Sequence, residues 1–160
     1  MGFDAANAVR VKRQVQAPVE AVWSVLSDGW VYATWVVGAS RVRAVDEGWP
    51  DEGRRIHHSF GLWPLLINDT TEVLSARKPT ELVLKARGWP LGEAMVLLSL
   101  EAESDQTCTV GIAEDAVSGP GKVAPMPLRQ ALILPRNREA LSRLAYLAEG
   151  RYRQSPMRSE

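Results

Sequence analysis

Residues 135–150 near the carboxyl terminus form one amphipathic segment that constrains the fold more than any other part of the sequence. Placed at 100° per residue, its apolar side chains gather on one arc of a helix and its charged side chains on the other. Because a helix with one apolar face must bury it, the rest of the chain has to supply a complementary surface. Gly150 is a suitable place for this helix to end. The apolar arc contains Ile133, Asn137, Ala140, Leu141, Leu144, Ala145, Leu147 and Ala148.

Upstream of this helix the spacing of apolar residues predicts a sheet with two short helices near its beginning. Residues 9–15 alternate as a half-buried first strand, whereas 18–26 and 30–35 have helical spacing. Further strands joined by turns, including a turn at 89–92, are expected at 40–44, 54–60, 66–77, 82–87, 94–100 and 108–114. The order predicts an α+β fold in which a curved antiparallel sheet of about seven strands grips a long C-terminal helix.

The segment that leads into the last helix is less regular. Residues 118–127 are rich in Gly and Pro and are expected to form a loop. Leu128 and Leu132 fall off the apolar arc, so a helix before Pro135 is expected to be kinked at that proline.

Composition limits the classes of partner. The 160 residues suit a single domain, which we expect at 9–150, with a flexible N-terminus at 1–8 and a polar tail at 151–160. Nineteen basic and nineteen acidic residues give zero formal net charge, which argues against nucleic-acid or membrane binding by bulk charge. One cysteine, no signal peptide and no apolar run of membrane-spanning length favour a cytoplasmic protein without membrane insertion. A homodimer is left open.

Several segments together resemble a known group of proteins. They are APVEAVWSVLSD at 17–28 with Trp35 after it, GWPDEGRRIHH at 48–58, DTTEVLSARKPTELVL at 69–84 and RNREALSRLAYLAEG at 136–150. In these segments the chain resembles the START-like helix-grip superfamily, also called SRPBCC, and within it the polyketide cyclase/dehydrase branch. The resemblance implies a cavity between sheet and helix that binds lipids, sterols, hormones, polyketides or quinones. It also implies that some members are cyclases or hydrolases, so fold alone does not fix function.

Standard catalytic signatures and metal-ligand clusters are missing from the sequence, so we expect no cofactor and no metal. If Ile56 and Phe60 face inward, His58 does too, and it could act as a general acid or base. Asp69 shares a strand face with Thr71 and could hold the His58 tautomer across the cavity. The alternatives are a hydrogen-bonded wall histidine and a solvated Asp69 at the strand end. His58 and Asp69 are the catalytic candidates.

Other polar and aromatic residues are candidates for ligand contact. Glu114 has the parity of an inward residue, and Asn137 lies at the centre of the apolar arc, where a polar side chain needs a partner. Aromatic residues at 30, 32, 35 and 63 suit the mouth of a cavity for a flat, apolar ligand. The expected ligand-binding residues are therefore Trp30, Tyr32, Trp35, His58, Trp63, Asp69, Thr71, Glu114 and Asn137.

The leading hypothesis is a protein that binds a small hydrophobic molecule, lipid-, polyketide- or aromatic-like, between sheet and helix. The first alternative is a cyclase- or dehydratase-like enzyme that uses His58 and Asp69 in acid/base chemistry, with Asn137 orienting a carbonyl. The second alternative is a protein–protein interaction module, which an exposed apolar patch outside the cavity would favour.

Overall fold

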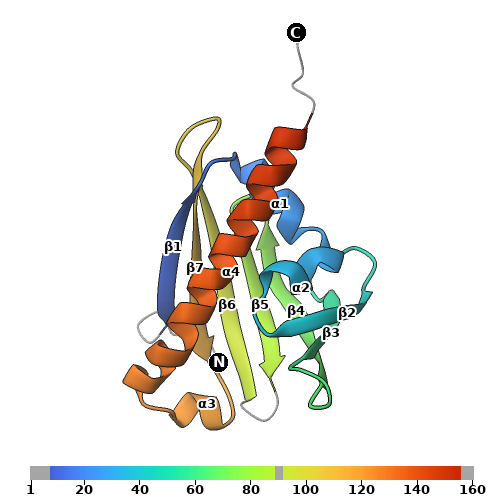
Figure 1. Cartoon of the computed structure of the whole chain (residues 1–160), viewed down its shortest axis with the longest axis vertical. Coiled ribbons are helices and arrows are strands. Elements are labelled where there is room, and N and C mark those ends of the chain that lie inside the picture. The colour runs from blue at the N-terminus through green and yellow to red at the C-terminus, as the bar shows by residue number, and fades with distance from the viewer. Residues whose placement is uncertain (1–7, 89–91, 156–160) are drawn as a thin grey trace.

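The sheet is antiparallel, has seven strands and curves around one long helix in the computed structural model, which describes residues 8–88 and 92–155 (Figure 1). Its strand order is β1-β7-β6-β5-β4-β3-β2, so consecutive strands from β2 to β7 are neighbours and β1 closes the row beside β7. The strands are β1 (Val9–Val15), β2 (Ala39–Val45), β3 (Arg55–Phe60), β4 (Ile67–Arg77), β5 (Glu81–Gly88), β6 (Gly92–Ala102) and β7 (Cys108–Ala116).

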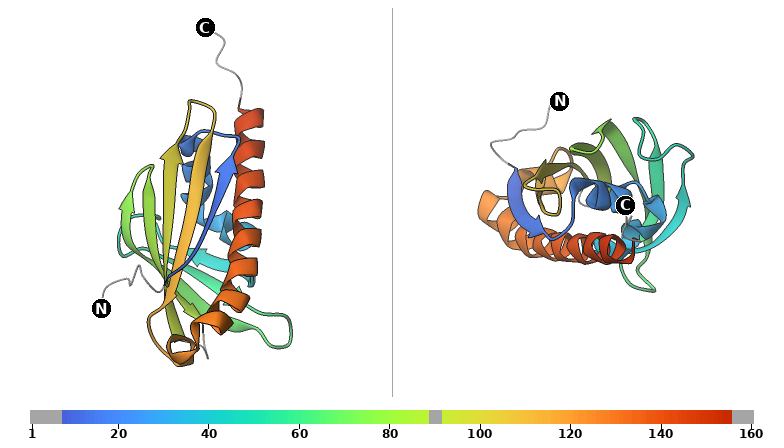
Figure 2. Two further views of the ribbon diagram at one scale, coloured as in Figure 1. Left: turned by 90° about the vertical axis from the view of Figure 1, so that its left-hand side faces the viewer. Right: turned by 90° about the horizontal axis from the view of Figure 1, so that it is seen from above.

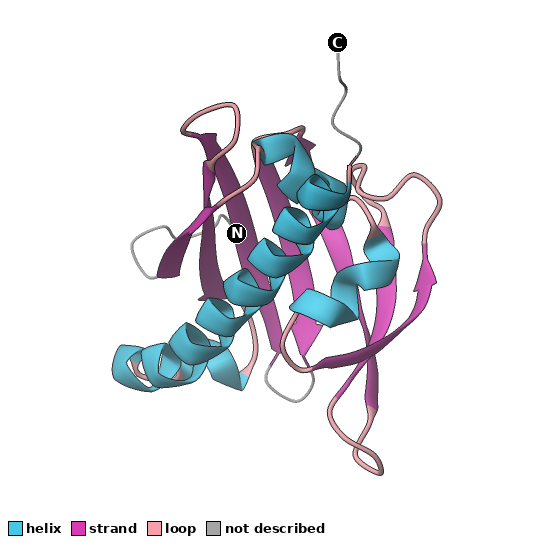
Figure 3. Ribbon diagram, turned by 45° about the horizontal axis from the view of Figure 1, so that its top comes forward, coloured by secondary structure: helices cyan, strands magenta, loops and turns pink. Residues whose placement is uncertain are grey.

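The helices fill the concave side of the sheet. α1 (Val19–Leu26), the 3-10 turn η1 (Gly29–Val31) and α2 (Tyr32–Trp35) connect β1 to β2, and α3 (Pro120–Val123) precedes α4 (Met126–Gln154). Figures 2 and 3 show α4 crossing the open side of the sheet, with α1 and α2 beside it. The predicted helix-grip fold, with a long C-terminal helix and short helices after the first strand, is confirmed.

The long helix differs from its predicted limits at both ends. It begins at Met126 and ends at Gln154, so the expected stop at Gly150 is wrong, and the expected loop at 118–127 contains α3 and the start of α4. The extension beyond Gly150 has a physical cause, because Arg151 donates to the Ser24 carbonyl oxygen at 2.9 Å and to Asp28 Oδ2 at 2.7 Å. The expected polar tail is therefore partly helical, and its residues 156–160 lie outside the described residues, as do the expected N-terminal residues 1–7 and the turn residues 89–91.

The core forms where the apolar arc of α4 meets the inner face of the sheet. Leu141 and Leu144 are buried against the apolar side chains that alternate strand residues direct inward. α1 contributes its own apolar face to the same core. These contributions from the strands and α1 include Val22, Val25, Ile56, Val73, Leu82, Leu84, Leu98, Val110 and Ile112.

Leu144 tests this packing. Its side chain is fully buried, whereas Tyr146 on the same helix is 68% exposed. We expect Leu144→Ala to lower the free energy of unfolding by about 2–5 kcal/mol, because it removes buried methyl groups and leaves a void. The control Tyr146→Ala should change it by no more than about 0.5 kcal/mol. Urea denaturation followed by circular dichroism measures both, and equal losses would contradict the described orientation of α4.

Candidate functional site

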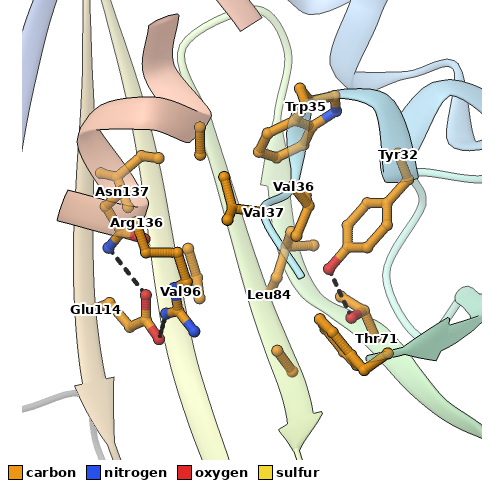
Figure 4. Close-up of a pocket in the computed structure, with 14 residues that line it drawn as sticks. Tyr32, Trp35, Val36, Val37, Thr71, Leu84, Val96, Glu114, Arg136 and Asn137 are labelled. Atoms are coloured by element: carbon orange, nitrogen blue, oxygen red, sulfur yellow. Dashed lines mark hydrogen bonds and ion pairs between the residues drawn. The ribbon is translucent and has the colours of Figure 1, made fainter. Parts of the chain in front are cut away.

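A cavity of about 80 Å³ lies between the inner face of β4–β7, the α2–β2 connection and the middle of α4 (Figure 4). Its wall is mostly apolar and has polar side chains at two ends. The lining residues are Tyr32, Trp35, Val36, Val37, Phe60, Thr71, Leu84, Ala86, Val96, Ile112, Glu114, Arg136, Asn137 and Ala140.

One polar end of the cavity is the carboxylate of Glu114 on β7. Its Oε2 accepts a hydrogen bond from Asn137 Nδ2 at 2.9 Å, and its Oε1 accepts from Arg136 Nη2 in an ion pair. Glu114 and Asn137 are buried, whereas the Arg136 side chain is 41% exposed. Both carboxylate oxygens are therefore engaged by α4, as a buried charge requires.

The other polar end is a chain of three side chains that leads from the cavity wall into the core. Tyr32 Oη lies 2.9 Å from Thr71 Oγ1, which lies 2.9 Å from His58 Nε2. The rings of Tyr32 and His58 are stacked with centroids 5.3 Å apart. Since the Thr71 hydroxyl carries one hydrogen, at least one of its two neighbours donates to it.

Burial controls the protonation of this chain. Burial lowers the pKa of His58 to about 4, although the charge of Asp69 acts in the opposite direction. Burial also raises the pKa of Tyr32 to about 12. At neutral pH the chain therefore consists of a neutral imidazole, a hydroxyl and a neutral phenol. His58 Nδ1 is buried and has no hydrogen-bond partner among the described residues.

The structure brings five of the expected ligand-binding residues to the cavity wall. These are Tyr32, Trp35, Thr71, Glu114 and Asn137. His58 faces inward as expected, but it lies behind Tyr32 and Thr71 and is not part of the lining.

Asp69 does not have its expected role. It is the direct cross-strand neighbour of His58 in the β3–β4 ladder, yet His58 Nε2 is held by Thr71 and Nδ1 has no hydrogen-bond partner. The Asp69 carboxylate instead accepts a hydrogen bond from the Thr70 backbone N–H at 2.8 Å. The prediction that Asp69 fixes the His58 tautomer across the cavity by a hydrogen bond is therefore wrong, although the charge of Asp69 does affect the pKa of His58.

The placement of Trp30 and Trp63 at the cavity is also wrong. Trp30 is 62% exposed in η1, where the tight turn directs Gly29 and Tyr32 inward instead. Trp63 is 85% exposed in the β3–β4 loop, which projects away from the sheet (Figure 1). Neither lines the cavity.

Sequence reasoning missed several lining residues, and most had a detectable signal. Leu84, Val96 and Ile112 share the strand parity of the buried core and could have been assigned to the cavity wall. Arg136 had a subtler signal, because a buried carboxylate such as Glu114 needs a cation within reach.

Residues 8–88 and 92–155 contain no group of three or more His, Cys, Asp or Glu side chains able to hold a metal ion. Over the same residues, none of the helices combines the length and the apolar character needed to span a bilayer.

The curved sheet, the helix across it and the cavity between them define a helix-grip protein. Residues 7–149 match the model of the family described as polyketide cyclase / dehydrase and lipid transport, and the chain belongs to this family. No curated protein matches the sequence.

Solved structures with the same fold are distant in sequence. The Zhui aromatase/cyclase from a Streptomyces species is 18% identical, with a TM-score of 0.69 over 93% of this chain and 97% of that one. A START superfamily protein from Mycobacterium smegmatis is 19% identical, with a TM-score of 0.65 over 92% and 97%. A protein from Nitrosomonas europaea is 17% identical, with a TM-score of 0.69 over 94% and 99%. At such identities the likeness establishes the fold.

The pKa of His58 makes a testable contribution to stability. A histidine whose pKa falls from about 6.5 unfolded to about 4 folded stabilises the fold above pH 6.5, and this contribution is lost as the pH falls towards 4. We expect a loss of about 3 kcal/mol over that interval. Urea denaturation between pH 7 and 4 should show a flatter pH dependence for His58→Gln than for the control His57→Gln. A His58 ring that titrates near pH 6.5 by NMR would contradict the assignment.

Proposed function

We propose that this protein binds a small, largely apolar molecule in the cavity between α4 and the sheet. The observation that carries the proposal is the cavity wall itself, which is apolar between the Tyr32–Thr71 end and the Glu114–Asn137 end. Apolar pockets with few polar groups are typical ligand sites. Membership of a family described as polyketide cyclase / dehydrase and lipid transport supports the same assignment.

The two polar ends differ in what they offer to such a ligand. The Glu114 carboxylate is already neutralised by Arg136 and bonded to Asn137, so this end favours a ligand without a net charge. At the other end the neutral phenol of Tyr32 lies on the wall and is held by Thr71. When His58 Nε2–H donates to Thr71 and Thr71 donates to Tyr32 Oη, the Tyr32 O–H is left for a ligand, so a carbonyl or ether oxygen is the polar atom that we expect a ligand to place there.

Filling the cavity tests the proposal. Ala140 lines the cavity from α4, and Ala140→Leu adds three carbon atoms inside a space of about 80 Å³. We expect this variant to bind an uncharged naphthylamine probe at least about tenfold more weakly, a change of about 1.4 kcal/mol. The measurement is a fluorescence titration.

The matched control is Ala131→Leu, which adds the same side chain at an exposed position of the same helix. It should bind the probe as the wild-type protein does. If Ala140→Leu binds the probe as tightly as the control, the ligand does not occupy the cavity and the proposal fails.

The second candidate function is acid/base catalysis of a cyclase or dehydratase type. The chain Tyr32–Thr71–His58 favours it, because it links a hydroxyl at the cavity wall to a buried imidazole. The free-energy cost of protonating His58 favours binding as the first candidate function. Protonating a group with a pKa of about 4 at pH 7 costs about 4 kcal/mol, which makes His58 a weak base.

His58→Gln separates the two functions. If the protein only binds, the probe affinity should stay within about threefold, because His58 lies behind the wall. If it is an enzyme, the same variant should lose turnover of a poly-β-ketone analogue at unchanged affinity, while the control His57→Gln keeps it. Turnover that survives in His58→Gln would eliminate this residue as the acid/base group.

A further inference from the structure

The β3–β4 connection presents the two most exposed large apolar side chains of the described residues, Leu62 and Trp63. In the loop at 61–66, called the apolar loop below, Leu62, Trp63 and Leu65 are between 79% and 85% exposed. Side chains of this size are normally buried, and their concentration on one loop marks an interaction site.

The apolar loop has a defined shape. The Gly61 N–H donates to the Gly38 carbonyl oxygen at 3.2 Å, and the Leu65 N–H donates to the Leu62 carbonyl oxygen at 2.7 Å. Gly61 has φ +90°, and a Cβ there would lie 2.6 Å from the Leu65 carbonyl oxygen, so glycine is required for this turn. The turn leaves the apolar side chains on the outside, and the loop projects beyond the sheet in Figures 1 and 3.

The apolar loop carries no charge, and the adjacent strand carries two arginines. Residues 59–68 contain no charged side chain. The adjacent strand β2 carries the exposed Arg41 and Arg43, and Arg41 is the ladder partner of Ser59, about two residues or roughly 7 Å from the loop. Both arginines donate to groups at the β3–β4 end of the sheet, namely Ser59 Oγ and the His58 and Asp69 carbonyl oxygens. An uncharged apolar tip with cations behind it complements a lipid surface that has anionic headgroups.

A second apolar group lies at the same end of the molecule. Val123 of α3 and Leu128 and Leu132 of α4 are 82%, 50% and 65% exposed. Figures 1 and 2 place α3 and the start of α4 at the end where the apolar loop projects. The cavity lies next to both groups, because its lining includes Phe60, just before the loop, and Arg136, one helical turn after Leu132.

We propose that the apolar loop docks on an anionic membrane surface by inserting Leu62, Trp63 and Leu65 into the headgroup region. Tryptophan prefers this interface, and a projecting loop reaches into it without moving the sheet. Three such side chains expose on the order of 500 Å², whereas a standard protein–protein interface buries about 800 Å² per partner. The zero net charge does not oppose this contact, since the apolar side chains and two local arginines provide it. The inference does not depend on which ligand occupies the cavity.

Vesicle co-sedimentation tests the proposal. The probe is the full-length protein with vesicles of phosphatidylcholine that contain about one-third phosphatidylserine. We expect Leu62→Ser/Trp63→Ser to weaken binding at least about tenfold. The matched control Trp30→Ser/Tyr146→Ser removes two other exposed aromatic side chains and should bind within about twofold of wild type. Arg41→Gln should weaken binding by about fivefold to these vesicles and leave binding to pure phosphatidylcholine unchanged.

A second measurement does not require a folded serine variant. Lipids brominated near the headgroup should quench part of the tryptophan fluorescence of the wild-type protein, and Trp63→Phe should remove that quenching. Absence of vesicle binding by the wild type, or an equal loss in the control variant, overturns the proposal. It is also overturned if the loop variant converts a dimer into a monomer while vesicles have no effect, because a second copy is then the occupant of the loop.

Discussion

The buried carboxylate of Glu114 is the constraint on which the arrangement of sheet, helix and cavity depends. A carboxylate on the inner face of β7 is tolerated only with a cation and a hydrogen-bond donor in place, and Arg136 and Asn137 of α4 supply both. Removing the Arg136 guanidinium would leave a buried charge whose desolvation costs several kcal/mol. The contacts of Arg136 and Asn137 with Glu114 therefore fix the distance between α4 and the sheet at the edge of the cavity.

The rest of α4 is held by contacts of two other kinds. Its middle turns bury Leu141 and Leu144 in the core, and its last turns are tied by polar contacts to the other end of the fold. There Glu149 Oε1 accepts from the Gln16 backbone N–H at 3.0 Å, and Arg151 forms an ion pair with Asp28. Before Arg136 the apolar contact of the helix is weaker, because Leu134 is only partly buried against the core and Leu128 and Leu132 stay exposed. The cavity thus occupies the region where the apolar packing of α4 gives way to amino-terminal turns held by the ion pair of Arg129 with Asp115.

The difference between apolar packing and specific polar contacts explains which features could be predicted from the sequence. Strand parity and helical spacing depend on which side chains meet the core, so they correctly assigned Thr71, Glu114 and Asn137 to the interior. The error about Asp69 has a different origin. Strand parity predicts the face on which a side chain lies but not its hydrogen-bond partner. His58 Nε2 is hydrogen-bonded to the hydroxyl of Thr71, two residues after Asp69 on the same strand.

The other errors concern contacts that no local period encodes. The prediction that the helix stops at Gly150 failed because the ion pair of Arg151 with Asp28 joins residues far apart in the sequence. Trp30 and Trp63 were assigned to the cavity because aromatic side chains at a cavity mouth suit a flat, apolar ligand. Both lie on connections, and whether a connection folds inward depends on turn geometry, such as the glycine conformation at Gly61.

The dimensions of the cavity set a scale for what it can bind without rearrangement. A cavity of about 80 Å³ is smaller than the roughly 150 Å³ space that accommodates benzene in an engineered protein. Burying about 150 Å² of apolar ligand surface gives about 4 kcal/mol, equivalent to a dissociation constant near 1 mM before the costs of association. Tighter binding therefore requires a larger contact area. One side of the cavity wall can move at a low cost in free energy. Val36 and Val37 belong to a short connection and are only half-buried, whereas the strands opposite are held by continuous ladders. We therefore expect a ligand larger than one ring to gain its contact area by displacing this connection and leaving the sheet unchanged.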